Sequence, residues 1–400
     1  MGFVTFFALT SLCFSQQHDS SSSAVCSPLK LCFAGDVMAH TPNFKGGKFN
    51  QIWEDVKPVF SASDFTFANL EAPVNTQKPF DTYPTFNMEP SYPQAAIDAG
   101  INVFSLANNH TNDQGLEGIL STYRYFEKLQ EQSSDSERKI YACGIKNKKD
   151  SPITYKVIQK GEWKILFAAV TEILNQKTAS GYIDFYKPKK EIRQNLADTL
   201  KKLRQENECD LFVLSIHCTE PEYITTVSRK QRNFYMELLN NGVDIIWANH
   251  PHVVRKWELV NVKKDKRMPA DEENLKCQKL IFYSMGNTIS GQRTKPDFAN
   301  PSSDRDNTGD GLIINVDFEK IGDKIKITKI DPHLITTIIT PSYGFQVKLL
   351  TDDYINQLYG PDKKGCGETK YLKSYNKKWA AYLTERKKIM EEFKGQISWQ

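Results

Sequence analysis

Side chains of the types that can bind metal ions follow several apolar runs of this 400-residue chain. Four of the seven histidines end such runs, namely His110, His217, His250 and His252. The oxygen-bearing side chains that end similar runs include Asp36, Glu71 and Asn109. Divalent metal ions bind neutral imidazole nitrogen and carboxylate oxygen, and an amide oxygen can also be a ligand. The sequence therefore predicts a metal site that combines oxygen and nitrogen ligands.

The prediction depends on the whole set, because a single histidine after a strand is usually a surface or hydrogen-bonded residue. One bridging carboxylate can hold two cations about 3.5–4 Å apart. The six candidate ligands are Asp36, Glu71, Asn109, His217, His250 and His252. This mixed set suits Mn, Fe or Zn. His40 follows Asp36 closely and is a candidate neighbour of the site.

Two of the candidate ligands are separated by a single proline, in the sequence His250-Pro251-His252. Residues two apart in an extended segment point the same way. We therefore expect an extended segment that turns both imidazoles toward one cluster, with Pro251 stiffening the link.

The pair Asn109-His110 predicts a ligand followed by a catalytic acid. The amide oxygen can bind metal while the imidazole protonates a leaving group or stabilises negative charge. Asp113, three residues later, is placed to orient His110. Alternatively, Asn108 and Asn109 cap the following helix, and both roles can hold because there are two asparagines.

The elements that position these residues form an alternating pattern. Continuous apolar runs rich in Val, Ile and Phe are typical of strands buried on both faces. Six such runs end in polar residues, at 29–36, 63–71, 101–110, 210–217, 243–252 and 279–287. Helical patterns lie at 115–130, 189–205 and 228–242, and Gly242 suits a helix C-terminus. This alternation predicts an α/β core that binds ligands beyond the carboxyl ends of its strands.

Two further segments alternate as antiparallel hairpins do. They are 151–170, with a turn at Lys160-Gly161, and 311–339, with a turn near Ile321-Gly322. The sheets are therefore predicted to be mixed. The loop at 263–276 is predicted to be solvated, and the loop at 291–311 follows the last apolar run and is placed to shape a substrate mouth.

The C-terminal piece, 345–400, carries a loose apolar stripe of Trp379, Leu383, Met390 and Phe393. We expect a helix that packs on the core; the alternative is a helix on a partner or membrane surface.

Composition excludes some classes of function. The 52 basic and 48 acidic residues nearly balance, and no basic stripe with interleaved aromatic residues occurs, which argues against nucleic-acid binding.

The uncharged start, MGFVTFFALTSLCFS, precedes a polar tract and predicts an export signal more than a membrane span. Cys13 is a candidate lipid anchor, although Leu12 is larger than such sites usually tolerate.

None of the eight cysteines forms a CxxC pair, which argues against zinc ligation by thiolates. Disulfides would suit an exported protein, but their connectivity cannot be read from the sequence.

The motifs AGDVM, DFTFANLEAPV, SLANNHTNDQG, IHCTEPEY, ANHPHVV and YSMGNTIS occur in the order that resembles the CapA family of capsule poly-γ-glutamate synthesis proteins. The resemblance covers roughly residues 29 to 340. NNHTNDQG, and NHPHVV joined to YSMGN, are its specific parts. It implies a four-layer α/β sandwich of calcineurin-like metallophosphoesterase type, with mixed sheets flanked by helices and two divalent metal ions at one sheet edge.

The resemblance also implies roles for residues. The six candidate ligands would bind the two metal ions, Glu71 would be the bridging carboxylate, and His110 the catalytic histidine. Asn69, Glu222 and Asn287 are the candidates for substrate contact. The predicted organisation is a leader and spacer at 1–28, a CapA-like domain at 29–344 and a helical extension at 345–400.

The chain departs from the family pattern at several positions near these residues. Cys218-Thr219 replaces a usual tryptophan and glycine, Glu222 falls one residue later than the usual acid, Ala248-Asn249 replaces a glycine-containing pair, and Thr288 replaces an aromatic residue. These changes affect the expected substrate contacts more than metal binding.

Two classes of function remain open at this stage. The first is an exported envelope protein, periplasmic or extracellular, that hydrolyses a phosphoester or a γ-glutamyl polymer with two metal ions. The second is a non-catalytic envelope protein that binds an anionic polymer or a synthesis partner, with its metal ions structural or lost. In either case we expect contact with the membrane only through the leader or a lipid anchor. A nucleotidase would need an aromatic sandwich for the base, and no separate domain provides an obvious one.

Overall fold

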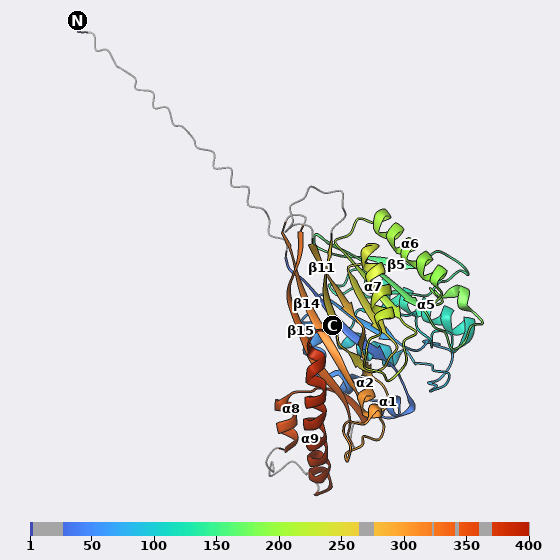
Figure 1. Ribbon diagram of the computed structural model, residues 1–400, viewed down its shortest axis with the longest axis vertical. Coiled ribbons are helices and arrows are strands. Elements are labelled where there is room, and N and C mark those ends of the chain that lie inside the picture. Colours follow the sequence, from blue (N-terminus) through green and yellow to red (C-terminus); the bar gives the residue numbers. More distant parts are fainter. Residues whose placement is uncertain (3–26, 264–275, 322–323, 341–343, 360–369, 400) are drawn as a thin grey trace.

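The computed structural model describes residues 1–2, 27–263, 276–321, 324–340, 344–359 and 370–399. Two β-sheets lie face to face and helices flank them (Figure 1). The predicted leader with Cys13 and most of the predicted loop at 263–276 lie outside the described residues.

The first sheet has the strand order β16-β15-β14-β1-β2-β3-β4, and β13 pairs with the end of β1. Strands β1 to β4 are parallel, whereas β14, β15 and β16 are antiparallel additions. The strands are β1 (Leu29–Val37), β2 (Phe65–Leu70), β3 (Val103–Ser105), β4 (Tyr141–Cys143), β13 (Asn287–Ile289), β14 (Asp310–Ile321), β15 (Lys324–Thr340) and β16 (Gly344–Leu349).

The second sheet has the order β10-β11-β8-β7-β6-β5, parallel in its centre and closed by an antiparallel strand at each edge. Its strands are β5 (Tyr155–Lys160), β6 (Trp163–Thr171), β7 (Leu211–His217), β8 (Ile245–Asn249), β10 (Glu258–Lys263) and β11 (Lys276–Phe282). A short ladder joins β9 (Val254–Arg255) to β12 (Ser284–Met285). Both predicted hairpins, β5–β6 and β14–β15, are confirmed.

Aromatic residues fill the space between the two sheets. Phe33 of β1 stacks on Phe67 of β2 with ring centroids 4.8 Å apart, and Phe67 lies 5.4 Å from Phe167 of β6. Trp247 of β8 donates a hydrogen bond from Nε1 to the Ala34 carbonyl at 2.8 Å, which ties one sheet to the other. The six buried apolar runs predicted from the sequence thus supply the strands that make this core.

Helices cover the outer faces. Along β7, Leu211 and Val213 face the core between the sheets, whereas Phe212 and Leu214 pack with α6 and α7. The helices are α1 (Thr41–Phe44), α2 (Phe49–Trp53), α3 (Lys57–Ser61), α4 (Ser91–Asp98), α5 (Gly115–Gln132), α6 (Lys190–Glu206), α7 (Arg229–Asn240), α8 (Asp352–Tyr359) and α9 (Lys370–Met390). The predicted α/β sandwich of mixed sheets flanked by helices is confirmed.

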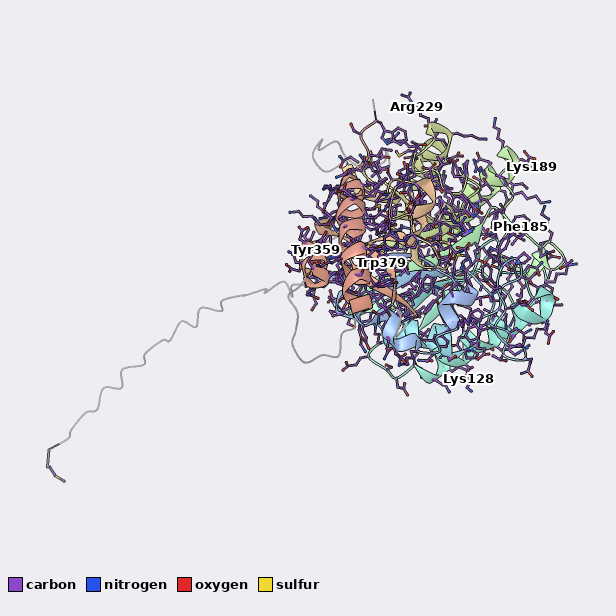
Figure 2. All side chains as sticks on the ribbon, turned by 90° about the horizontal axis from the view of Figure 1, so that it is seen from below. Lys128, Phe185, Lys189, Arg229, Tyr359 and Trp379 are labelled. Atoms are coloured by element: carbon purple, nitrogen blue, oxygen red, sulfur yellow. The ribbon has the colours of Figure 1, made fainter. Side chains whose placement is uncertain are left out.

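The C-terminal residues are part of this architecture. Strand β16 carries the first sheet to Leu349, beyond the predicted boundary at 344. Helix α9 carries Trp379, which is labelled in Figure 2. The four residues of the predicted stripe, Trp379, Leu383, Met390 and Phe393, all belong to the hydrophobic core. In the part of the chain that the structure describes, no helix has the length and apolar character needed to cross a bilayer.

The described cysteines are free. Cys32, Cys143 and Cys218 are buried thiols, and Cys209 and Cys277 are partly buried. Burial raises the pKa of the Cys32 and Cys218 thiols to about 12, so both remain neutral at physiological pH.

Candidate metal centre

The carboxyl ends of the central strands bring the predicted ligands together. Asp36 lies near the end of β1 and is paired in register with Asn69 on the parallel strand β2. In the second sheet His217 ends β7, in register with Asn249 at the end of β8. Because parallel strands end at one edge of their sheet, residues far apart in sequence converge there.

A close approach between two backbones fixes the position of Asp36. The Asp36 N–H donates to the Gly286 carbonyl at 3.0 Å, and the Gly35 N–H donates to Thr288 Oγ1 at 2.7 Å. A Cβ atom at position 35 would lie 1.8 Å from the Gly286 oxygen, so only glycine fits. Thr288, a departure from the family pattern, thus acts as the acceptor that holds β1 in place.

Asp36, Glu71 and His217 form a buried donor group. One ligand atom from each lies within 4.8 Å of the others, and none of the three residues is more than 1% exposed. Glu71 Oε1 lies 3.7 Å from His217 Nε2, and Asn109 Oδ1 lies 2.9 Å from the same nitrogen. The first four predicted ligands therefore lie together, with contributions from both sheets.

A second donor group adjoins the first. Glu222, His250 and His252 also offer ligand atoms within 4.8 Å of one another. His252 Nδ1 lies 3.1 Å from Asp36 Oδ2, and His252 Nε2 lies 3.5 Å from Glu71 Oε1. Glu71 Oε1 is thus within 4 Å of a histidine from each group, which agrees with the bridging role that the resemblance implies for Glu71.

The predicted extended conformation of residues 250–252 is wrong. Strand β8 ends at Asn249, and both histidines have positive φ, +109° for His250 and +57° for His252. Such angles are sparsely populated by residues other than glycine, and they concentrate at functional sites. The rings still lie near one another, with centroids 6.0 Å apart, because a tight bend brings them together and not the alternation of a strand.

The donor atoms have the properties of metal ligands. Glu71 Oε1 and His250 Nδ1 are buried and have no hydrogen-bond partner. Leaving a buried acceptor unpaired costs roughly 1–3 kcal/mol, and a bound cation would remove that penalty. The residues present therefore fit a divalent metal ion.

The electrostatics agree with this fit. Burial, together with the nearby histidines, holds the pKa of His217 well below its usual range and lowers that of His250 to about 4, so both rings are neutral and able to bind metal. Burial and the adjacent Asp36 carboxylate raise the pKa of Glu71. Burial also acts to lower the pKa of His252, but its contact with Asp36 outweighs this effect and raises it. A cation would offset the repulsion between Asp36 and Glu71.

His110 lies beside the donor groups with its predicted partner. His110 Nδ1 lies 2.7 Å from Asp113 Oδ2, which also accepts the Phe86 N–H at 2.9 Å. The Phe86 ring packs edge-on against His110 with centroids 4.7 Å apart. Asn175 Nδ2 lies 3.4 Å from His110 Nδ1. Phe86 and Asn175 could not be recognised from the sequence, because both lie in irregular loops without a pattern.

The asparagines before His110 do not cap a helix. Helix α5 begins at Gly115, after Gln114, and has no side-chain cap. Asn108 instead accepts the His110 N–H at 3.2 Å and donates to the Leu70 carbonyl at 2.8 Å. The capping alternative is therefore wrong, and Asn108 holds the loop that presents Asn109 and His110.

Two residues predicted to contact substrate are engaged inside the site. Asn69 Nδ2 donates to Asp36 Oδ1 at 2.8 Å and to Glu71 Oε2 at 3.1 Å. Asn287 Oδ1 lies 3.1 Å from His252 Nδ1. Both asparagines are at most 1% exposed, so the geometry favours a positioning role for them.

Glu222 is the exposed member of the second donor group. Its side chain is 37% exposed and lies 4.0 Å from His250 Nε2. The neighbouring Tyr223 is 41% exposed, and its ring centroid is 6.4 Å from that of His252. His40 is a further neighbour, because its ring packs on Phe86 with centroids 4.9 Å apart.

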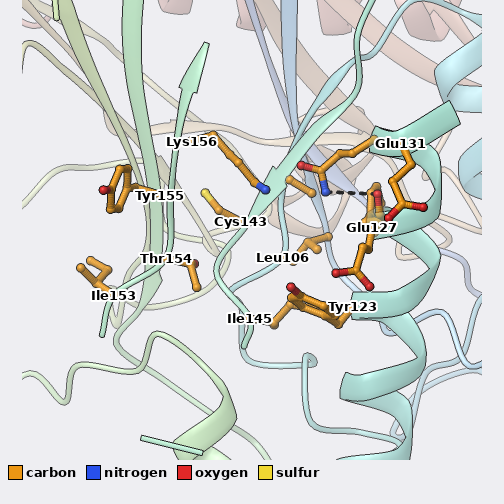
Figure 3. Close-up of a pocket in the computed structure, with 13 residues that line it drawn as sticks. Leu106, Tyr123, Glu127, Glu131, Cys143, Ile145, Ile153, Thr154, Tyr155 and Lys156 are labelled. Carbon is orange, nitrogen blue, oxygen red and sulfur yellow. Dashed lines mark hydrogen bonds between the residues drawn. The ribbon is translucent and has the colours of Figure 1, made fainter. Parts of the chain in front are cut away.

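A separate pocket of about 410 Å³ lies between α5 and β5 (Figure 3). Its wall includes Tyr123, Glu127 and Glu131 from the helix, and Thr154 and Lys156 on the opposite side. The described residues that line it include none of the candidate ligands.

Sequence comparison assigns the family. The chain belongs to the bacterial capsule synthesis protein family PGA_cap, whose sequence model matches residues 30–292. It is 25% identical over 322 residues to the PGA biosynthesis protein CapA of Bacillus subtilis (strain 168), which covers 77% of this chain and 73% of that protein. It is 25% identical over 258 residues to the capsule biosynthesis protein CapA of Bacillus anthracis, which covers 61% of this chain and 55% of that protein. The resemblance to the CapA family is confirmed.

Comparison with solved structures gives the following matches, each with a TM-score of 0.40 or below. A hypothetical protein from Thermus thermophilus has a TM-score of 0.40 at 14% identity, over 76% of this chain and 98% of that one. A putative 5'-nucleotidase from Staphylococcus aureus has a TM-score of 0.40 at 14% identity, and the match covers 88% of this chain and 59% of that one. The calcineurin-like phosphoesterase YfkN from Bacillus subtilis has a TM-score of 0.38 at 11% identity, and the match covers 77% of this chain and 90% of that one.

Proposed function

We propose that this protein is a divalent-metal-dependent hydrolase of the cell envelope that acts in capsule poly-γ-glutamate synthesis. The proposal rests on one observation, the convergence of a buried, mixed donor set around the unpaired Glu71 Oε1. Two ions of Mn, Fe or Zn would be held by Asp36, Glu71, Asn109, His217, His250 and His252. When bound, such ions lower the pKa of water and neutralise charge that develops on an oxygen.

The chain's own groups would complete the chemistry. Asp113 fixes His110 by its contact with Nδ1, which leaves Nε2 to donate a proton to a leaving group. The Phe86 ring covers one side of the imidazole and restricts its rotation. His110 would thus be the general acid and Asp113 its orienting partner.

The substrate would be a phosphoester or a γ-glutamyl polymer. Both classes develop negative charge on an oxygen during hydrolysis, and a site rich in cations stabilises that charge. Glu222 is the exposed member of the donor groups and remains the candidate for contact with the substrate.

A second function is favoured by the depth of the site. Each of the six candidate ligands is at most 5% exposed. Metal ions held so deeply would suit a structural role, in a non-catalytic protein that binds an anionic polymer or an envelope synthesis partner. The His110→Asn variant separates the two functions. A hydrolase should lose turnover in this variant, whereas a non-catalytic protein has no turnover to lose.

The proposed location is the cell envelope, outside the cytoplasm. It is supported by the capsule synthesis family and by the apolar start of the sequence. Fractionation of cells that express the chain with and without residues 1–28 tests it. Equal retention of both forms in the cytoplasm would contradict export.

Metal analysis of protein purified without chelator tests the proposed centre. We expect about two ions per chain in the wild type and a clear loss in the His250→Ala/His252→Ala double variant, because both imidazoles belong to the donor set. His333→Ala is the matched control, since that histidine lies on β15 outside the site and should leave metal content unchanged. If the wild type binds no Mn or Zn even when either is added, the hydrolase proposal fails. Bound metal without hydrolysis of phosphoesters or γ-glutamyl polymers would favour the polymer-binding protein.

A further inference from the structure

Arg386 of α9 is a fully buried arginine that forms hydrogen bonds with the segment Pro301–Asp310, far from it in sequence. It donates from Nε to Asp310 Oδ2 at 2.6 Å, from Nη1 to the Pro301 carbonyl at 2.7 Å and from Nη2 to Asn307 Oδ1 at 2.8 Å. The guanidinium therefore fixes the segment Pro301–Asp310 at both ends and near its middle. A planar group with five donors is suited to such a multiple contact.

A second buried arginine, Arg293, binds the same aspartate. We call Arg386, Arg293 and the segment Pro301–Asp310 that they hold the clamp. Arg293 Nη1 donates to Asp310 Oδ1 at 2.8 Å, and Nη2 donates to Thr336 Oγ1 at 2.8 Å. Asp310 thus has each carboxylate oxygen bound to a different arginine. Removal of one partner from such a buried network is strongly destabilising, because it leaves a buried charge uncompensated.

The clamped segment contacts the metal centre through Asn287. The Thr308 carbonyl accepts a hydrogen bond from Asn287 Nδ2 at 2.9 Å, and Gln292 Oε1 accepts another at 2.9 Å. With the amide nitrogen satisfied in this way, the amide oxygen must face His252 Nδ1, 3.1 Å away. The other ring nitrogen of His252, Nε2, lies 3.5 Å from Glu71 Oε1.

We infer that Arg386 is a positioning residue for the metal centre. It holds Pro301–Asp310 so that Thr308 orients Asn287 and Asn287 orients His252. The inference rests on the proposed metal-dependent function. It also gives the C-terminal helix, which lies beyond the family match at residues 30–292, a part in the site.

Metal affinity measured on the full chain tests the inference. Loss of an outer partner of a metal-ligating histidine typically weakens metal binding by about 10–100-fold. Because the path from Arg386 runs through Thr308 and Asn287, we expect Arg386→Gln to weaken Mn²⁺ binding by about tenfold in calorimetric titration. Asn307→Ala removes only one contact of the clamp and should weaken binding less while preserving the fold.

Leu383→Ala is the matched control for stability. Leu383 is equally buried on the same helix, but its apolar side chain donates none of the hydrogen bonds that hold Pro301–Asp310, so the variant loses packing while those bonds remain. Urea unfolding of each variant provides the comparison. We expect Leu383→Ala to lower the free energy of unfolding and to keep wild-type Mn²⁺ affinity.

A double-mutant cycle examines the path itself. Arg386→Gln and Asn287→Ala should weaken Mn²⁺ binding together by less than the product of their separate effects, because they interrupt one path. Wild-type affinity in both Asn307→Ala and Arg386→Gln would overturn the inference and leave the proposed metal centre intact. Independent effects in the cycle would overturn it as well. If the wild type binds no Mn²⁺, the proposed function fails and the inference fails with it.

Discussion

At the scale of single residues, the site separates candidate metal ligands from residues that orient them. Glu71 Oε1 is left unpaired between His217 and His252. Around it Asn69 and Asn287 use their hydrogen bonds to fix Asp36 and His252. A buried metal site needs both kinds of residue, because unsupported ligands lose precision and affinity.

His110 provides the most direct test of catalysis. Substitution His110→Asn removes the only imidazole paired with Asp113 in the described site, and general acid catalysis typically contributes about 10²–10⁴-fold. We expect kcat for an aryl phosphodiester to fall by that order while metal content stays near wild type. Asp113→Asn should reduce kcat less, because the ring remains in place. Unchanged turnover in His110→Asn would assign the proton transfer to another group.

Asp310 predicts a specific dependence of stability on pH. Burial acts to raise the pKa of Asp310, but the charges of Arg386 and Arg293 outweigh it and lower the pKa below its usual value. A carboxylate with a lowered pKa in the folded state stabilises the protein above its unfolded pKa, and this contribution disappears as pH falls through the folded pKa.

Asp310→Asn should therefore lower the free energy of unfolding at neutral pH by about 3–5 kcal/mol, because two buried guanidinium groups lose their anion. The difference from wild type should shrink as pH is lowered below about 4, the unfolded pKa of an aspartate. Urea unfolding across this pH range measures it. A difference that is constant with pH would show that the ionised form of Asp310 is not what stabilises the fold.

The ligand types could be predicted from sequence because each stands where an apolar run ends, as Asp36 and His217 do. The supporting residues could not be predicted in the same way. Phe86 and Asn175 reach His110 from loops far along the chain, and no local pattern encodes such contacts. The positive φ angles at His250 and His252 were likewise hidden, because the sequence His-Pro-His fits an extended segment equally well.

At the scale of elements, the close contact between β1 and the Met285–Asn287 turn sets the position of the candidate ligand Asp36. Gly35 lies against the Gly286 carbonyl, and Gly286 itself has a φ of +69°. This contact fixes the position of the next residue, Asp36. The sequence AGD predicts a ligand at the end of a strand, but only the structure explains why a glycine precedes it.

Gly35→Ala tests this contact. The added methyl group would lie 1.8 Å from a backbone oxygen, which cannot move aside as a side chain does. We expect a loss of more than about 3 kcal/mol in the free energy of unfolding and weaker metal binding, because the strand must shift. Gly395→Ala is the control, since its added Cβ would meet nothing closer than 3.5 Å. Equal stability of the two variants in urea unfolding would contradict the role given to Gly35.

At the scale of the whole molecule, the C-terminal residues complete the architecture that the strands begin. The alternation of strands and helices correctly predicts the two-sheet sandwich, because the central strands are buried on both faces. It does not reveal that β16 extends the first sheet to Leu349, or that α9 supplies Arg386 to the clamp. Both depend on pairing between distant segments, which apolar patterns do not specify.

Truncation after Leu350 tests whether α8 and α9 form an accessory part or belong to the core. The shortened chain would lose Trp379 and Leu383 from the hydrophobic core and leave Asp310 with Arg293 as its remaining arginine partner. Burial of a large side chain typically contributes about 1.5–3 kcal/mol, and a domain is stable by only about 5–15 kcal/mol. We therefore expect the shortened chain to lack a cooperative unfolding transition, measured by circular dichroism. A chain ending at Gly395 keeps both helices and should unfold cooperatively like the full protein. If the Leu350 truncation also unfolds cooperatively and binds metal with wild-type affinity, the helices are accessory and the clamp is dispensable.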